Sequence, residues 1–456
     1  MHRPCTGRGA FAVCLSRPGV VLIALCMALA VPLSAQPLLD LGASPNFVGS
    51  GARALGQGNA FIAVADDATA ASWNPGGLPQ LEKPEISLAV EGFRRRSEMD
   101  SSTDPTIDST DTLSLADLNY LSAVYPFRLG ARHAVVSLNY LKHYRFDAKG
   151  DFSFALREPL PWGPTWENFS DVRVRYEQEG SLSSLSPAFG MEITDRLMLG
   201  LALNLWNDDL TGDSSFGYRS TEQGQYGIRF MGNSIVRNTQ NNSSEGTYTV
   251  QRGYSLALGG LYRLTDRWSV GAVVKPPFTL HLKHERTYTD YVNPTASSDT
   301  RRDADLEFPW VIGGGVAFRP SDALTLSGDV TWSQWSEYTL DERGTTLNPL
   351  TSQSIHTDEC EDTVSVRLGA EYLVIRENYM VPLRCGVGYD PGPAVNEIDR
   401  FYTGTLGVGL QKGRFALDLA YELRLGRGVN GSAAVNLNAE QDVVQHRLLA
   451  SVIVYF

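Results

Sequence analysis

The chain has 456 residues, of which 43% are hydrophobic, 20% charged and 10% aromatic, and its formal net charge is -12. The acidic balance argues against a nucleic-acid partner, because phosphate binding needs a clustered basic face. Only one apolar stretch approaches membrane-spanning length, and it lies at the N-terminus, so a bundle of membrane helices is excluded.

The first 35 residues have the layout of a secretory signal peptide. Basic residues precede an apolar run from Val20 to Leu33, and the small residues Ser34 and Ala35 follow it. The run is shorter than the ~20 residues that a spanning helix needs. We therefore expect residues 1–35 to be cleaved after Ala35 on export.

Residues 36–83 form a second unit, which is rich in small residues and does not alternate as a strand does. Small residues let backbones pack closely in a confined space. Asp66 and Asp67 suit the start of a short Ala-rich helix, and Asn74-Pro75-Gly76 marks a sharp break. Arg53 is expected to pair with the two aspartates. We predict a small, partly helical hatch that plugs a larger structure.

Residues 84–456 alternate between apolar and polar side chains with the period of a β-strand. Examples are Phe415–Leu425, Val364–Tyr372 and Leu197–Trp206. The predicted strands run for about 11–18 residues, whereas strands of globular proteins average about 5–6. Such long, half-apolar strands favour a sheet with one face in lipid.

The connections between these strands come in two alternating sizes. The short ones are 128–132, 194–196, 265–267, 320–322, 376–379 and 412–413, and the long ones lie near 98–115, 148–170, 212–245, 286–302, 340–359, 391–399 and 426–443. Six short and seven long connections join fourteen strands. Short turns on one side and long loops on the other are typical of an outer-membrane barrel, which has no unpaired edge. We predict an all-β, fourteen-stranded antiparallel transmembrane barrel over 84–456, with solvated long loops.

Charged residues in these strands are predicted to face the lumen, because an Arg or Lys on the lipid face at mid-membrane costs ~2–4 kcal/mol. With Leu417 assigned to lipid, the inward residues are Arg367, Glu371, Arg384, Asp418, Glu422 and Arg424. Their first interpretation is a salt-bridge network that braces the wall. The alternative is that Arg367 or Arg384 meets the carboxylate of a ligand.

Three prolines mark places where the wall is expected to kink. Pro276 and Pro277 remove two neighbouring ladder donors from one strand, and Pro187 removes one from another. Trp268 fits one membrane interface, and Trp206, Trp332 and Trp335 fit the other, with plain packing as the alternative for each taken singly.

Two cysteines remain after cleavage, Cys360 and Cys385. A hairpin turning near Glu377 would place Cys385 opposite residue 370, too far from Cys360 for a disulfide.

At the C-terminus, an apolar face ends in Phe456, the kind of signature by which assembly machinery recognises outer-membrane proteins.

The N-terminal segment resembles the hatch of the long-chain fatty acid transporter (FadL) family of outer-membrane proteins. The matching residues are Ala65-Asp66-Asp67-Ala68 and the stretch Trp73-Asn74-Pro75-Gly76, in which Gly76 stands where the family usually has Ala. Further similarity covers 307–315, 332–336 and 384–390. The hatch motif is also shared with PorV-like barrels of type IX secretion.

The resemblance implies passive uptake of hydrophobic compounds, such as long-chain fatty acids or aromatic hydrocarbons, with a sideways exit through the wall near the hatch motif. No cofactor, metal or catalytic residue is expected, and the expected partners are a hydrophobic ligand, outer-membrane lipid and, through Phe456, the barrel assembly machinery. We expect a monomer. The alternative is a PorV-like barrel that docks proteins for secretion.

Overall fold

The computed structural model describes residues 50–101, 106–161, 163, 165–349, 360–393, 398–429 and 439–456. The predicted signal peptide and the first part of the predicted hatch lie outside these residues.

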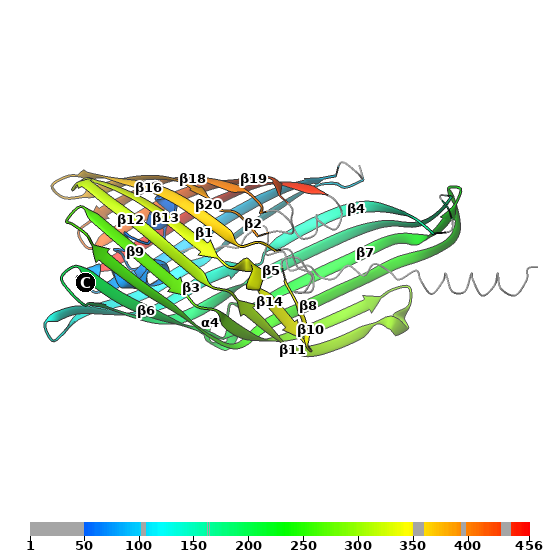
Figure 1. Ribbon diagram of the computed structural model, residues 1–456, viewed down its shortest axis with the longest axis horizontal. Coiled ribbons are helices and arrows are strands. Elements are labelled where there is room, and N and C mark those ends of the chain that lie inside the picture. Colours follow the sequence, from blue (N-terminus) through cyan, green and yellow to red (C-terminus); the bar gives the residue numbers. More distant parts are fainter. Residues whose placement is uncertain are drawn as a thin grey trace, which may run out of the picture.

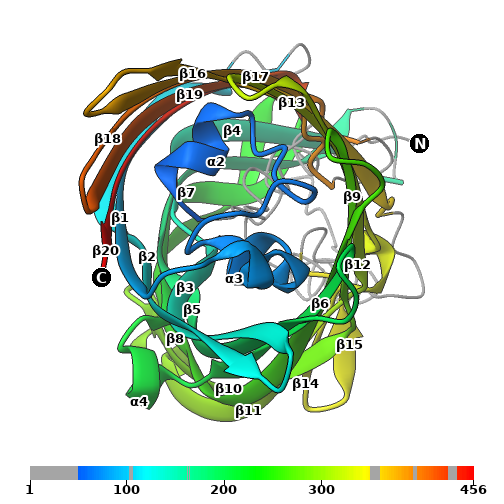
Figure 2. The ribbon, with the colours of Figure 1, turned by 90° about the vertical axis from the view of Figure 1, so that its left-hand side faces the viewer.

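Fourteen strands of the described chain form a closed antiparallel barrel, as predicted (Figures 1 and 2). In order around the ring they are β1 (Glu85–Asp100), β2 (Asp108–Leu129), β3 (Arg132–Arg145), β5 (Trp166–Glu192), β6 (Leu197–Trp206), β8 (Asn233–Arg263), β9 (Trp268–Lys275), β12 (Val311–Ser321), β13 (Leu324–Ser333), β16 (Thr363–Ile375), β17 (Met380–Tyr389), β18 (Phe401–Lys412), β19 (Phe415–Val429) and β20 (Glu440–Tyr455). The ring closes between β1 and β20, which pair from Glu85–Tyr455 to Asp100–Glu440.

Six more strands extend the sheet at the end of the barrel away from the short turns. They are β4 (Ala148–Pro159), β7 (Ser214–Phe230), β10 (Phe278–Asp290), β11 (Ser298–Phe308), β14 (Thr339–Glu342) and β15 (Thr345–Leu347). The wall is therefore tallest where β4, β5, β7 and β8 run together (Figure 1).

The prediction of solvated loops near 98–115, 148–170, 212–245 and 286–302 was wrong for most of their length. These segments are paired strands, and β8 alone spans 31 residues. The strand pattern was not visible in the sequence, because the inward side chains of these segments are partly polar, as Glu222 and Gln240 are, and only partly apolar. Val172, Val174 and Phe152 belong to a small inner apolar cluster and are at most 7% exposed. Backbone pairing thus continues well above the level expected from apolar alternation alone.

The two faces of the barrel strands follow the predicted alternation. Leu417 and Leu419 are 49% and 45% exposed, whereas Asp418 and Glu422 are buried inside. Similar exposed aliphatic residues recur on β1, β3, β8 and β12, which makes a continuous apolar band around the outside. An exposed apolar surface of this extent is informative, because soluble monomers rarely show one.

The described helices are short, and none is long and apolar enough to cross a membrane. They are α2 (Ala52–Gly56), α3 (Ala70–Trp73), η1 (Pro75–Gln80), α4 (Asp208–Thr211), η2 (Pro294–Ala296) and η3 (Trp335–Glu337). The first three belong to residues 50–83, which we call the luminal segment because they lie inside the ring of strands (Figure 2).

The aromatic residues were placed only partly correctly from the sequence. Trp268 is 42% exposed beside the short turns, as expected. Trp206 and Trp335 are each 2% exposed and lie in a buried cluster, so their assignment to a membrane interface was wrong. The alternation of the strand predicts this burial, because Trp206 lies on the same inward face as Ala202, whereas the neighbouring leucines lie on the outward face.

The cysteine prediction rested on the register of one hairpin. Cys385 pairs with Ala370, as predicted, and its side chain is exposed while Cys360 is buried.

Candidate functional site

A belt of glycines on the barrel wall makes room for the luminal segment. A Cβ at Gly200 would clash with the Pro75 carbonyl, one at Gly271 with the Ile62 carbonyl, and one at Gly386 with the backbone of Gly58. Further wall glycines that face the segment are Gly259, Gly315, Gly369 and Gly407. Since backbone meets backbone here, no larger side chain fits without moving the segment.

Asn74 joins the luminal segment to the wall. Its side-chain Nδ2 donates to the Ile62 carbonyl at 2.8 Å and to the Gly260 carbonyl of β8 at 3.0 Å, and its Oδ1 accepts from the Gly76 amide at 3.0 Å. Pro75 follows as the first residue of η1. A methyl group at Gly76 would lie 2.7 Å from the Gly260 Cα atom. Close contact with β8 therefore explains glycine at the motif's third position.

Replacing Asn74 by aspartate should loosen the luminal segment. The substitution keeps the shape but removes both donations and turns a carboxylate toward two carbonyl oxygens. Leaving such buried groups unpaired costs about 1–3 kcal/mol. We expect a lower unfolding temperature in detergent and faster proteolysis within the luminal segment. Asn233→Asp, at an exposed turn, is the matched control and should change neither; equal effects would contradict the role of Asn74.

Arg53 anchors the luminal segment to the wall through ion pairs. Its guanidinium lies 2.8 Å from the Asp66 carboxylate and 3.8 Å from that of Asp67, and it binds both oxygens of Glu371 on β16 at 3.0 and 3.1 Å. Asp66 also pairs with Arg319 at 3.0 Å. The predicted pairing of Arg53 with the aspartates is thus present, and Glu371 is a stronger partner than sequence reasoning foresaw.

The chain of charges continues into the wall. Arg384 Nε lies 2.6 Å from Glu371, and its Nη1 lies 2.5 Å from Asp418. Glu371 and Arg384 have side chains that are at most 4% exposed. Buried charges of this kind are tolerated only when each has a hydrogen-bonded counterion. Three of the predicted inward residues therefore form one network with Arg53.

A second network of charges contains Glu422. The sequence predicted that Glu422 faces the lumen but not which residues it pairs with. Glu422 accepts from Asn59 of the luminal segment and pairs with Arg447 on β20, both at 3.4 Å. Arg447 lies 3.0 Å from Glu91, which is also 3.0 Å from Arg145. Alternation on β20 is the signal that would have found Arg447, because it faces away from the exposed Leu448.

Arg367 and Arg424 share one partner at the outer side of the luminal segment. Arg367 Nη2 lies 2.5 Å from the Asp390 carboxylate, and Arg424 Nη2 donates to the Asp390 carbonyl at 3.1 Å. The Arg424 guanidinium also lies 3.9 Å from the ring centroid of Phe401. Of the six predicted lumen residues, Arg367 alone borders the cavity described next.

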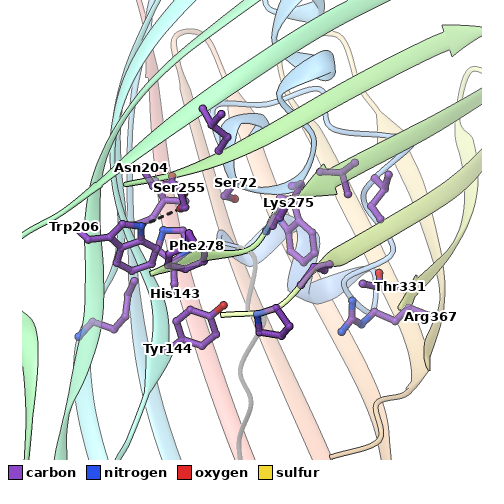
Figure 3. Close-up of a pocket in the computed structure, with 18 residues that line it drawn as sticks. Ser72, His143, Tyr144, Asn204, Trp206, Ser255, Lys275, Phe278, Thr331 and Arg367 are labelled. Atoms are coloured by element: carbon purple, nitrogen blue, oxygen red, sulfur yellow. Dashed lines mark hydrogen bonds between the residues drawn. The ribbon is translucent and has the colours of Figure 1, made fainter. Parts of the chain in front are cut away.

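A cavity of about 70 Å³ lies between the luminal segment and the wall (Figure 3). Its aromatic lining is Trp73, Tyr144, Trp206 and Phe278. Lys142, His143, Lys275 and Arg367 also border it, and none of its described lining residues is acidic. The Trp206 indole donates to the Ser255 hydroxyl at 2.9 Å, which fixes the ring against the cavity. The cavity therefore combines an aromatic and aliphatic lining with several polar and cationic groups, so it offers both apolar contact and orienting polar contacts.

Stacked aromatic rings continue from the cavity toward the outer strands. Phe278 lies between Trp206 and Phe308, with ring centroids 5.5 and 4.8 Å away. Phe308 contacts Tyr338 at 5.1 Å, and the cluster includes Trp335. Sequence reasoning missed this cluster, since its members come from strands far apart in the chain.

The predicted kinks differ in how far they interrupt the wall. At Pro187 the β5–β6 ladder skips from Leu185–Leu205 to Ala188–Ala202. At Pro276–Pro277 the strand is cut into β9 and β10.

The family model for an outer membrane protein transport protein (OMPP1/FadL/TodX) matches residues 44–402. A search of curated proteins found no significant match. Among solved structures, a Pseudomonas aeruginosa FadL homologue aligns with a TM-score of 0.57 at 16% identity, over 89% of this chain and 98% of the other.

Two further structures share the fold. The Ralstonia pickettii toluene transporter TbuX aligns with a TM-score of 0.54 at 14% identity, over 90% of this chain and 99% of that one. The Pseudomonas putida toluene transporter TodX has the same TM-score at 13% identity, over 90% and 98%. At these identities the likeness establishes the fold.

Proposed function

The chain belongs to the OMPP1/FadL/TodX family of outer-membrane transport proteins, and we propose that it is a passive channel for small hydrophobic compounds. Aromatic hydrocarbons or fatty acids enter from the outer end of the barrel, reach the cavity beside the luminal segment and leave sideways through the wall. The two similar structures named toluene transporters support the aromatic alternative.

The observation that carries this proposal is the aromatic cavity next to the luminal segment. Apolar surface gains about 25 cal/mol per Å² on leaving water, so such a chamber holds a hydrophobic solute without covalent chemistry. A cavity of about 150 Å³ holds benzene, which is larger than the 70 Å³ seen here. A ring such as Phe278 must therefore move aside when a solute binds.

The way the luminal segment fills the barrel supports a sideways exit. Its backbone touches the wall glycines on β6, β9 and β17, and Arg53 ties it to β16. A straight path to the end with the short turns would pass the charged side chains of Arg53, Asp67 and Glu371. An apolar solute crosses into lipid at lower cost than into that charged passage.

Uptake measurements test the proposal. Gram-negative cells that lack their own transporter of this kind should take up radiolabelled toluene or oleate faster when they make this protein. Val273→Trp fills the cavity and should return uptake to the level of cells without the protein. Val274→Trp is the control, because the next residue on β9 points to the opposite face. No gain with either probe would refute the proposal.

The docking alternative receives no support from the comparisons, which point to transport. The predicted recognition of Phe456 by the barrel assembly machinery stays a prediction. The Phe456 side chain is 67% exposed at the end of β20, so it is accessible for such contact.

A further inference from the structure

Two neighbouring strands of the wall are interrupted at the same height. β9 pairs with β12 as far as Lys275–Val311, and β10 pairs with β11 from Phe278–Phe308. Between these two pairs the ladder is missing, although the strands keep the same register before and after the missing pairs. We call the gap the seam: Pro276 and Pro277 on one strand, Pro309 and Trp310 on the other. Three of these four residues are prolines without an N–H, so no ladder can form across it.

The seam is unpaired on its other flank as well. β8 pairs with β9 up to Leu258–Val274 and with β10 from Gly253–Leu280. The backbone of residues 276–279 therefore lies outside the ladders with β8 as well. A segment with so few backbone hydrogen bonds is easier to displace than the continuous ladders around it.

A hollow meets the seam from each side of the wall. The inner cavity of about 70 Å³ reaches Phe278 and Pro309. A groove of about 390 Å³ is bordered by the same two residues and by Glu307 and Trp310, which are exposed on the outer face. Phe278, which lines the inner cavity (Figure 3), borders both spaces and stacks on Trp206 and Phe308.

Two other places near the hatch motif are bridged by hydrogen bonds. Beside the hatch motif, β6 and β8 pair without interruption from Leu197–Tyr262 to Trp206–Gly253. At Pro187, the Ser186 hydroxyl donates to Asn204 at 2.7 Å, and Asn139 donates to the Ser186 carbonyl at 2.7 Å. Side chains thus replace the backbone bonds that the proline removes.

We propose that the seam is the lateral exit of this channel and that Phe278 is its gating residue. This inference rests on the proposed function. A solute in the cavity displaces the Phe278 ring from its place between Trp206 and Phe308, passes between the prolines and enters the groove. Trp310 and Ile312 lie on the same outward face at 40% and 44% exposure, so the groove opens at the end of the apolar band. The solute therefore leaves into the outer part of the membrane.

Chemical blocking of the groove tests the exit. Trp310→Cys is made in a Cys385→Ser background, because the exposed Cys385 thiol would otherwise react. The cells are treated with a bulky maleimide, labelling is quantified by mass, and uptake of radiolabelled toluene and oleate is measured before and after treatment. Uptake by labelled Trp310→Cys should fall to the level of cells without the protein. Labelled Ile312→Cys, two residues along the same face, should transport as before treatment.

The outcomes separate the two proposals. If the untreated parent protein carries neither probe, the proposed function fails. If the parent transports and labelled Trp310→Cys does so equally well, the exit is not at the seam. Equal inhibition of labelled Ile312→Cys would also overturn the assignment. Phe278→Ala gives a second measure: uptake of the transported probe should rise, and an unchanged rate would remove Phe278 as the gate.

Discussion

Replacing Gly200 by valine should unseat the luminal segment while the barrel still closes. The new side chain would occupy the place of the Pro75 backbone, which has no room to retreat because it is held by Asn74 and β8. Inserting extra methylene groups into a packed core costs about 1–3 kcal/mol of stability. A clash with the fixed backbone of Pro75 costs more, because the backbone cannot change rotamer as a side chain can. The wall itself gains from valine, which favours strands more than glycine does.

The measurement is permeability. Cells that make Gly200→Val should become sensitive to a large hydrophilic antibiotic that the outer membrane normally excludes. The barrel should still migrate as a folded species in an unheated gel. Deletion of residues 42–82 sets the upper limit of leakage.

Gly404→Val is the matched control, because a Cβ at Gly404 has no neighbour within 4 Å. It should leave antibiotic sensitivity unchanged. If Gly200→Val folds and remains as tight as the parent, the luminal segment is not what seals the barrel.

Replacing Glu371 by glutamine should cost substantial stability, because its carboxylate is shared by two arginines. Glu371 stands between Arg53 and Arg384, and its loss leaves Arg53 with Asp66 and Asp67, and Arg384 with Asp418, as the remaining carboxylates. Removing one partner from a buried ion pair costs up to about 3–5 kcal/mol. We expect a matching fall in the free energy of unfolding, measured by denaturant titration in detergent with tryptophan fluorescence.

An exposed pair provides the comparison. Arg219 and Glu245 lie 2.8 Å apart on the outer strands with side chains about 60% exposed. Surface pairs contribute about 0–1 kcal/mol, so Glu245→Gln should change stability little. Similar losses for the two variants would show that burial of the Glu371 network is unimportant.

Most of the fold could be predicted from the local alternation of apolar and polar residues, which gives the strands and their inward and outward faces. The exposed Leu417 and the buried Asp418 differ only in the face of one strand, and the cost of charge in lipid decides which face points inward. Turn position also fixed the pairing of Cys385 with Ala370. Both depend on neighbours along the chain or across one short hairpin.

What the sequence did not reveal depends on distant strands. The partner of Arg53 on β16 is 318 residues away, and nothing local selects Glu371 over another carboxylate. The stacking of Phe278 with Phe308 follows from the register of two strands that were expected to be separated by a loop. The height of the outer strands was missed because polar side chains mask alternation once neither face touches lipid.

The position of the luminal segment has a consequence for how the barrel forms. The segment directly precedes β1, yet it touches β8 through Asn74 and β18 through Gly58, whose amide donates to Thr405 at 3.0 Å. Asn74 is also bonded to the Ile62 carbonyl, so its contact with β8 lies within about 20 Å of Gly58. In a flat, open sheet β8 and β18 would be six strands apart, about 29 Å, which the folded segment does not span. The contacts can therefore coexist only when the sheet is curved, so the segment acts as a template that favours ring closure.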